Sequence, residues 1–205
     1  MLLIVDMGSS NLASVRRAAE IVGSEATISA DPDEINCADA VILPGVGAFA
    51  DGVSKLHKQN LFVPLRAAAA RGVPMLGICL GMQLFAEGSE EGGVHGGLGL
   101  IEGNCVRLVP GSLSARVPNI GWCDVKVQKE SCLFNTNSSN ESFYFAHSYH
   151  LETSAEIRVA SFEFGGRDIT AAIEYRNIYG VQFHPEKSQD SGLDVLSAFL
   201  RRIKV

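Results

Sequence analysis

The stretch PMLGICLGMQLF, residues 74 to 85, places one cysteine between two glycines, with an apolar run before it and helix-forming residues after it. The run at 73–78 predicts a buried strand, and a helix is expected to start near Leu80. The spacing G-x-C-x-G (Gly77, Cys79, Gly81) is typical of a nucleophile elbow, a strained strand-to-helix turn that needs small neighbours. The start of that helix favours a thiolate, and the Leu80 N–H could stabilise an oxyanion. A cysteine that only packs in the core is the alternative.

The rest of the chain continues the alternation that the elbow begins. Apolar runs at 2–6, 25–30 and 38–45 predict buried strands, and helical spacing is found at 11–23, 49–58 and 61–71. This order predicts an α/β fold of three layers, with a mostly parallel central sheet and helices on both faces. After residue 88 strand and turn signals dominate until a final helical pattern at 192–205, so additional antiparallel strands are expected to extend the sheet. Without a clear boundary, residues 1–205 are expected to form one domain.

Composition narrows the class of protein. The 205 residues are 46% hydrophobic and carry a net charge of -6 without a Lys/Arg-rich run, which argues against a nucleic-acid partner. The N-terminal residues lack the features of a signal peptide, and no apolar run approaches the roughly 20 residues of a membrane span. The five cysteines form no CxxC pair, so a reducing cytoplasm is expected rather than a disulfide framework or a zinc site. No metal and no cofactor are expected.

A nucleophilic cysteine needs a base, and FHPE at 183–186 offers one. His184 follows an apolar strand, and Glu186 can accept a hydrogen bond from the imidazole and support its positive charge. A simple strand-to-loop junction with a solvated glutamate is the alternative. His147 and His150 could also line the crevice, although a hydrogen-bonded structural role is more common for a histidine at a strand end. The sequence PGVG at 44–47 ends another buried strand, and its glycines would let backbone N–H groups approach a ligand.

Together, PGVG, GICLGMQ and FHPE resemble the class I (triad) glutamine amidotransferases. The segments DMGSSNLASV, PNIGW, YFAHSYH and GVQFHPEKS follow, in order, the pattern of the glutaminase subunits of imidazole glycerol phosphate synthase. The resemblance covers nearly the whole chain. It implies hydrolysis of L-glutamine and transfer of the ammonia to a partner cyclase subunit, a (βα)8 barrel of histidine biosynthesis.

The resemblance also assigns roles by position. Cys79 would be the nucleophile, His184 the general base and acid, and Glu186 the orienting carboxylate. The oxyanion would be bound by Gly45, Val46, Gly47 and Leu80. The amide and α-amino groups of the substrate would be held by Gly47, Gln83 and Glu91, and its α-carboxylate by Ser148 and Tyr149. Positions facing the partner would be Asn11, Trp122, Tyr144 and Lys187. The PGVG loop is implied to reach its productive orientation only when the partner is bound.

Four residues depart from the family pattern, namely Met7, Ser10, Asn119 and Cys123. None belongs to the triad, and all but Cys123 lie in segments near the expected interface, so they bear on partner contact. Three alternative functions stay open at this point. They are a paralogous glutaminase subunit, for example one of nucleotide-sugar amination, a cysteine-elbow hydrolase that acts on peptides, and a regulatory module that keeps the fold without activity.

Overall fold

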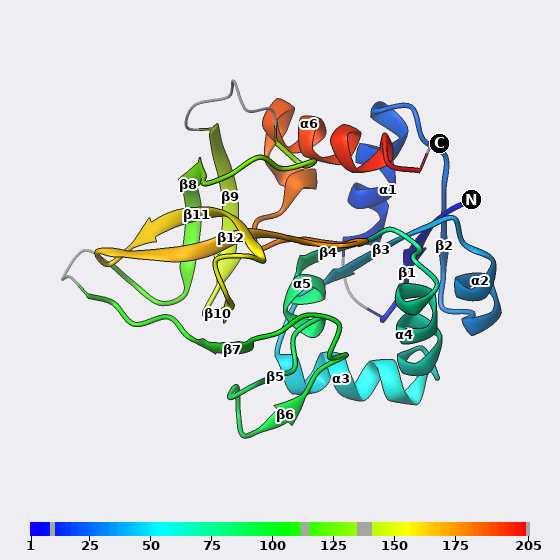
Figure 1. Cartoon of the computed structure of the whole chain (residues 1–205), viewed down its shortest axis with the longest axis horizontal. Coiled ribbons are helices and arrows are strands. Elements are labelled where there is room, and N and C mark those ends of the chain that lie inside the picture. Colours follow the sequence, from blue (N-terminus) through cyan, green and yellow to red (C-terminus); the bar gives the residue numbers. More distant parts are fainter. Residues whose placement is uncertain (9–10, 112–114, 135–140, 204–205) are drawn as a thin grey trace.

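A nine-stranded sheet forms the centre of the protein (Figure 1). The computed structural model describes residues 1–8, 11–111, 115–134 and 141–203. The strands of the parallel half are, in spatial order, β2 (Ala26–Ser29), β1 (Leu2–Val5), β3 (Ala40–Gly45), β4 (Met75–Cys79) and β13 (Ile178–Val181). The antiparallel half continues with β12 (Arg167–Tyr175), β11 (Arg158–Phe164), β8 (Asn119–Val127) and β9 (Glu141–His147). The predicted α/β fold, with antiparallel strands added to a parallel sheet, is confirmed.

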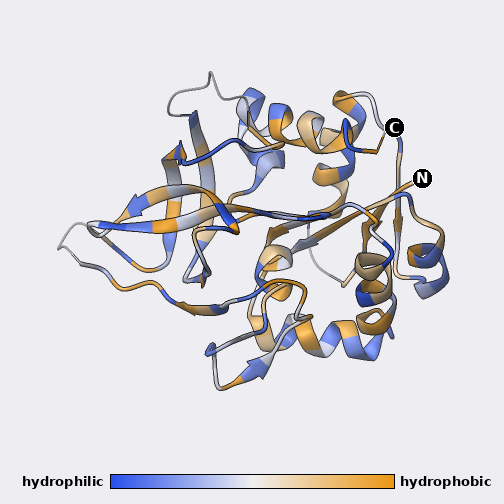
Figure 2. Cartoon of the chain, in the orientation of Figure 1, coloured by the Kyte–Doolittle hydropathy of each residue, from blue (hydrophilic) through white to orange (hydrophobic). Residues whose placement is uncertain are grey.

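Helices cover both faces of the parallel half because its strands are apolar on both sides. In β1, Leu2 and Ile4 face one core, which also contains residues of α1 (Leu12–Ile21) and α6 (Gln189–Leu200). Leu3 and Val5 face the other core, with α2 (Pro32–Cys37), α3 (Phe49–Lys58) and α4 (Phe62–Ala70). Figure 2 shows hydrophobic and hydrophilic residues side by side along these helices, as expected for helices with one buried face.

Strand β13 joins the two halves of the sheet. It pairs parallel with β4, so that Val181 lies opposite Ile78, and antiparallel with β12. The carboxyl ends of parallel strands meet at one edge, where ligand sites of α/β sheets are found. This pairing therefore brings the residues that follow β4 and β13 to the same place, although about a hundred residues of chain separate them.

A second, four-stranded sheet packs beside the α3 side of the molecule and was not expected from the sequence. Its strands, in spatial order, are β10 (Tyr149–Glu152), β7 (Asn104–Arg107), β5 (Gly88–Ser89) and β6 (His95–Gly96). The β-rich segment YFAHSYH thus divides at Ser148, because β9 belongs to the large sheet and β10 to the small one. The short helix α2 was also not expected.

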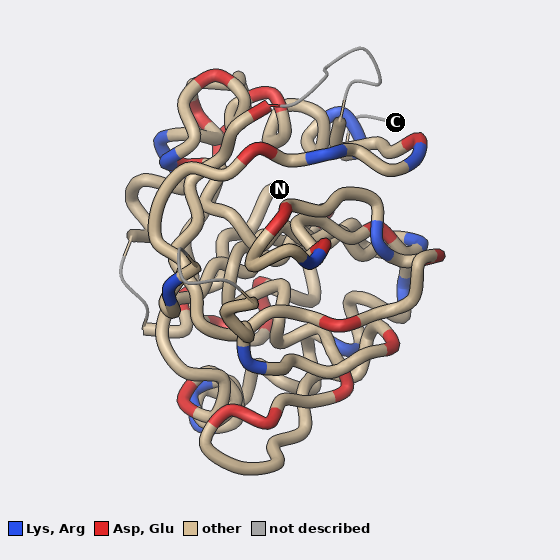
Figure 3. The backbone as a smooth tube through the Cα atoms, turned by 90° about the vertical axis from the view of Figure 1, so that its left-hand side faces the viewer, with Lys and Arg blue, Asp and Glu red and all other residues tan. Residues whose placement is uncertain are grey.

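Charged residues of both signs are interspersed on the side of the molecule shown in Figure 3. No helix in the described part of the chain is long and apolar enough to cross a membrane.

Candidate active site

Cys79 occupies a strained turn at the end of β4, where α5 (Leu80–Leu84) begins. Its φ of 53° and ψ of -109° are uncommon for a residue with a side chain. A Cβ on Gly77 would lie 2.5 Å from the backbone nitrogen of Met82, and a Cβ on Gly81 would lie 1.7 Å from the carbonyl oxygen of Leu43. Both glycines are therefore required by close backbone contacts, which is the geometry of the predicted elbow.

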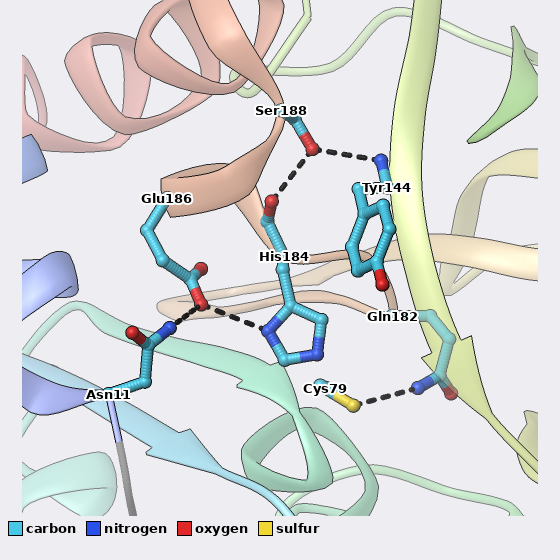
Figure 4. Close-up of polar contacts among 7 residues, drawn as sticks. All are labelled: Asn11, Cys79, Tyr144, Gln182, His184, Glu186 and Ser188. Atoms are coloured by element: carbon cyan, nitrogen blue, oxygen red, sulfur yellow. Dashed lines mark hydrogen bonds and ion pairs between the residues drawn. The ribbon is translucent and has the colours of Figure 1, made fainter. Parts of the chain in front are cut away.

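The imidazole of His184 lies beside the sulfur of Cys79, and Glu186 lies on the opposite side of the ring (Figure 4). The His184 Nδ1 to Glu186 Oε1 distance is 3.0 Å, and the two side chains are 4% and 2% exposed. Since a carboxylate oxygen accepts, Nδ1 carries the proton and Nε2 faces the thiol. The structure thus brings together the three residues that were predicted as the triad.

A fourth residue, Asn11, contacts the same carboxylate. Its Nδ2 donates to Oε1 of Glu186 at 2.6 Å, from the residue that precedes α1. The sequence placed Asn11 among positions that face a partner, and that role stays a prediction. The contact with Glu186 could not be inferred from the sequence, because the two residues are 175 positions apart.

Burial alone would lower the pKa of His184, but hydrogen bonds and charge from Cys79 and Glu186 outweigh it and raise the pKa to about 9. Because the ring lies between a sulfur and a carboxylate, its charged imidazolium form is favoured at neutral pH. This is the charge state in which a cysteine–histidine pair is a ready nucleophile and proton donor.

The backbone of His184 is fixed by Ser188. The Ser188 hydroxyl donates to the carbonyl of His184 at 2.7 Å and accepts from the N–H of Tyr144 at 3.0 Å (Figure 4). The short 3-10 helix η1 (Pro185–Lys187) closes the loop between these two residues. The main chain that carries the catalytic ring is thereby hydrogen-bonded to Ser188 at the start of α6 and, through Ser188, to β9.

A cavity of about 360 Å³ opens next to the thiol. Most of the predicted substrate-binding residues lie on its wall, together with Cys79 and His184, namely Val46, Gly47, Leu80, Gln83, Glu91, Ser148 and Tyr149. Gly45 lies at the buried end of β3, where a Cβ would come within 3.1 Å of the side chain of Leu80. What Gly45 supplies is close packing of β3 on the elbow, and Gly47, with a φ of 102°, carries the turn beside the cavity.

Two polar residues on the cavity wall are held by the backbone. The Gln83 Nε2 donates to the carbonyl of Tyr149 at 2.8 Å, and the Glu91 Oε2 accepts from the N–H of Phe49 at 2.8 Å. Their positions are therefore set before any ligand enters, which favours binding of a small polar molecule.

His147 also lines the cavity, and it is neutral. Its Nδ1 donates to the carbonyl of Tyr149 at 2.9 Å, so its Nε2 is free to accept from Asn119 at 3.3 Å. Burial lowers the pKa of His147 to about 4. His147 is thus both a structural, hydrogen-bonded histidine and part of the cavity wall.

The residues that depart from the family pattern lie in different surroundings. Asn119 contacts His147 and, at 3.6 Å, the sulfur of Cys123. Met7 is 1% exposed and packs in the core, so it does not face a partner directly. Ser10 lies outside the described residues.

An apolar surface borders the mouth of the cavity. Trp122 and Ile120 are 49% and 63% exposed, and Trp122 stacks edge-on against Tyr144 with ring centroids 6.2 Å apart. The ammonium of Lys187 lies 5.6 Å from the centre of the Tyr144 ring. Three of the four residues predicted to face a partner thus lie together on one surface, which we call the aromatic rim (Ile120, Trp122, Tyr144 and Lys187).

All five cysteines are free thiols. Within the described ranges, no group of three His, Cys, Asp or Glu side chains is placed to hold a metal ion.

Comparison with known proteins agrees with this site. The family model described as "Glutamine amidotransferase class-I" matches residues 3–203. The chain belongs to this family. As a class I amidotransferase it carries the elbow and the FHPE segment in the positions described above.

Two proteins named imidazole glycerol phosphate synthase subunit HisH are similar to this amidotransferase over nearly all of its length. The protein of Moorella thermoacetica is 43% identical over 96% of this chain and 92% of its own length. That of Methanothermobacter thermautotrophicus is 43% identical over 100% of both chains. Two solved structures share the fold: a glutamine amidotransferase (TM-score 0.76, 17% identity, 99% of each chain) and PurLQS from Thermotoga maritima (TM-score 0.74, 21% identity, 98% of this chain and 97% of that one).

Proposed function

We propose that this chain is the glutaminase subunit of an imidazole glycerol phosphate synthase, with residues 1–205 as its amidotransferase domain. It would hydrolyse L-glutamine to L-glutamate and pass the ammonia to a cyclase subunit, in the cytoplasm, where its free thiols would stay reduced. The observation that carries the proposal is the strained Cys79 beside the buried His184–Glu186 pair, in a chain whose full-length relatives are subunits of that synthase.

In the first half of the reaction, the Cys79 sulfur attacks the side-chain carbonyl carbon of glutamine. The carbonyl oxygen becomes an oxyanion, which the N–H groups of Leu80 and of the Val46–Gly47 turn, on the cavity wall, would stabilise. His184 then gives its Nε2 proton to the leaving nitrogen, and ammonia departs from a γ-glutamyl thioester.

In the second half, the neutral His184 takes a proton from water while the water oxygen attacks the thioester. Collapse of this intermediate releases glutamate and returns the sulfur to its starting state. Glu186 holds the ring at Nδ1 throughout, so that Nε2 stays directed at the reacting atoms.

The partner would bind over the aromatic rim. Aromatic residues next to a positive charge are common at interface centres, and here the exposed Trp122 and the half-buried Tyr144 lie beside Lys187 near the mouth of the cavity. A (βα)8 barrel docked there would receive ammonia without its passing through bulk water. The exposed Val46, on the same cavity wall, gives that partner a direct contact with the PGVG turn.

The test is co-purification of the tagged chain from its native cell, followed by assay of the purified pair for glutamate release and for formation of imidazole glycerol phosphate. Cys79→Ala should reduce glutamate release by several orders of magnitude, because the covalent step is lost. The matched control is Cys37→Ala, an exposed thiol outside the cavity, which should behave as wild type.

A Cys79→Ala pair that hydrolyses glutamine at the wild-type rate would overturn the mechanism. Capture of a different synthase, with glutamine turnover intact, would overturn the pathway and leave the glutaminase chemistry standing.

A further inference from the structure

Gln182 is a buried polar residue at the end of the central strand β13. It follows β13 and precedes Phe183, and its side chain is completely shielded from solvent. A side-chain amide in such a place needs hydrogen-bond partners, since an unpaired buried amide is costly. Its partners are the sulfur of Cys79, as Figure 4 shows, and Gln83 on the wall of the substrate cavity.

The orientation of the Gln182 amide follows from a chain of three hydrogen bonds. The carbonyl of Tyr149 can only accept, so Gln83 must turn its Nε2 toward it, at 2.8 Å. The second N–H of the same nitrogen donates to Oε1 of Gln182 at 3.0 Å. The nitrogen of Gln182 must then face the other way, where the sulfur of Cys79 lies at 3.6 Å.

We propose that Gln182 is a catalytic residue that donates an N–H to the sulfur of Cys79 and stabilises its anionic form, in an orientation set by the Tyr149 carbonyl through Gln83. A donor aimed at a sulfur favours the thiolate over the thiol, because a hydrogen bond to an anion is stronger than one to a neutral acceptor. The role rests on the proposed glutaminase function.

The same chain of bonds links the nucleophile to substrate binding. Both N–H groups of Gln83 are used within the protein, so the atom that Gln83 can offer to a ligand in the cavity is its Oε1, an acceptor. A primary amide in the substrate would donate to that oxygen. Gln182 thus joins Gln83 to the thiol through side-chain hydrogen bonds, and a change at Gln182 would reach both steps.

Titratable groups from several elements line the cavity next to the sulfur. They are His184 after β13, His147 on β9, Tyr149 on β10, Glu91 after β5 and Lys187 on η1. Gln182 differs from all of them in having no group that titrates, so its effect on the thiolate does not change with pH and can be separated from theirs.

The experiment measures the rate at which iodoacetamide alkylates Cys79, as a function of pH, in the substrate-free full chain. Gln182→Met keeps the size and removes the donor, and it should move the midpoint of the rate profile to higher pH. The rate below the midpoint should fall about tenfold, as expected for loss of one hydrogen bond to a charged group. In the complex with the partner, kcat should fall by a similar factor.

Gln182→Glu is the second variant. It nearly keeps the shape but places a negative oxygen near the sulfur, so its midpoint should rise further than that of Gln182→Met. It decides the question alone if the methionine variant does not fold. The matched control is Gln128→Met, which removes the amide that donates to Ser161 at 2.8 Å, away from the cavity. Its alkylation profile should equal that of wild type.

A purely structural role predicts a different pattern, in which Gln182 variants raise KM through Gln83 and leave the alkylation midpoint unchanged. That pattern would overturn the proposal. So would alkylation rates of the Gln182 variants that stay within about twofold of the wild-type rate at a fixed pH below the midpoint. Failure of the proposed function gives a separate result, namely wild-type protein that releases no glutamate with its partner.

Discussion

Replacement of Gly81 by alanine tests whether the elbow requires its glycines for steric reasons. The new Cβ would lie 1.7 Å from the carbonyl oxygen of Leu43 and 2.8 Å from its carbonyl carbon. Ordinary packing begins at 3.4 Å, so β3 and α5 would have to separate by about 1.7 Å. Both elements are buried backbone in the middle of the fold, and neither can rotate away as a side chain could.

We expect Gly81→Ala to lower the free energy of unfolding by about 3 kcal/mol, the upper end of the range for overpacked cores. It should also reduce kcat/KM for glutamine about 100-fold, because a displacement of 1 Å at a nucleophile has an effect of that order. Urea unfolding and glutamate release in the complex measure the two quantities.

Gly96→Ala is the control for Gly81→Ala. Gly96 has no positive φ, and the nearest atom to its added Cβ is 4.0 Å away. If both variants unfold at the same urea concentration and turn over glutamine alike, the steric account of the elbow is wrong.

Four further outcomes follow from the site. The hydrogen bonds and charges of Cys79 and Glu186 together raise the pKa of His184 to about 9. Glu186→Gln removes the Glu186 charge, so the fall in activity on the alkaline side, where the imidazolium is lost, should move to lower pH in rate profiles of the complex. His147 is buried in its neutral form with a pKa of about 4, so between pH 6.5 and pH 4 the unfolded chain binds a proton that the folded chain does not. The free energy of unfolding should therefore fall by about 3 kcal/mol as the pH drops through that window. In urea unfolding, His147→Gln should lose this contribution to the pH dependence of stability. Asn11→Ala removes a hydrogen bond to a buried carboxylate and should lower the free energy of unfolding by about 2 kcal/mol, whereas alanine at the exposed Asn36 should change little. Trp122→Ala should weaken partner binding about 30-fold in calorimetry, as loss of an interface aromatic does, and an equal loss with alanine at the 74% exposed Val63 on α4 would contradict the docking surface.

Much of this fold could be predicted because its signals are local. The helices at 49–58 and 61–71 were expected nearly at their observed bounds, since apolar periodicity and flanking glycines mark them within a few residues. The elbow could be predicted for the same reason, because its two glycines and the cysteine between them lie within five positions of one another.

What could not be predicted depends on contacts between distant segments. No periodicity indicates that β13 enters the sheet between β4 and β12, or that the backbone changes sheets at Ser148. Short strands such as β5 and β6, with two residues each, are too brief to give a pattern.

Gln182 did give a signal, an amide within the otherwise apolar run YGVQF. Its meaning became clear only once the sulfur of Cys79 was known to lie 3.6 Å away. Similarly, the contact of Asn11 with Glu186 joins the beginning of the chain to a residue near its end.

The place of β13 between β4 and β12 has a consequence for biosynthesis. A ribosome makes Cys79 and its turn early, whereas the neighbouring central strand and His184 are translated about a hundred residues later. A nascent chain that is still being elongated therefore has the sulfur but no base to activate it, and its sheet has an unfilled edge at β4. The chain becomes competent only after the segment that carries His184 has been made and has entered the sheet, so products truncated before that segment would release no free ammonia into the cell.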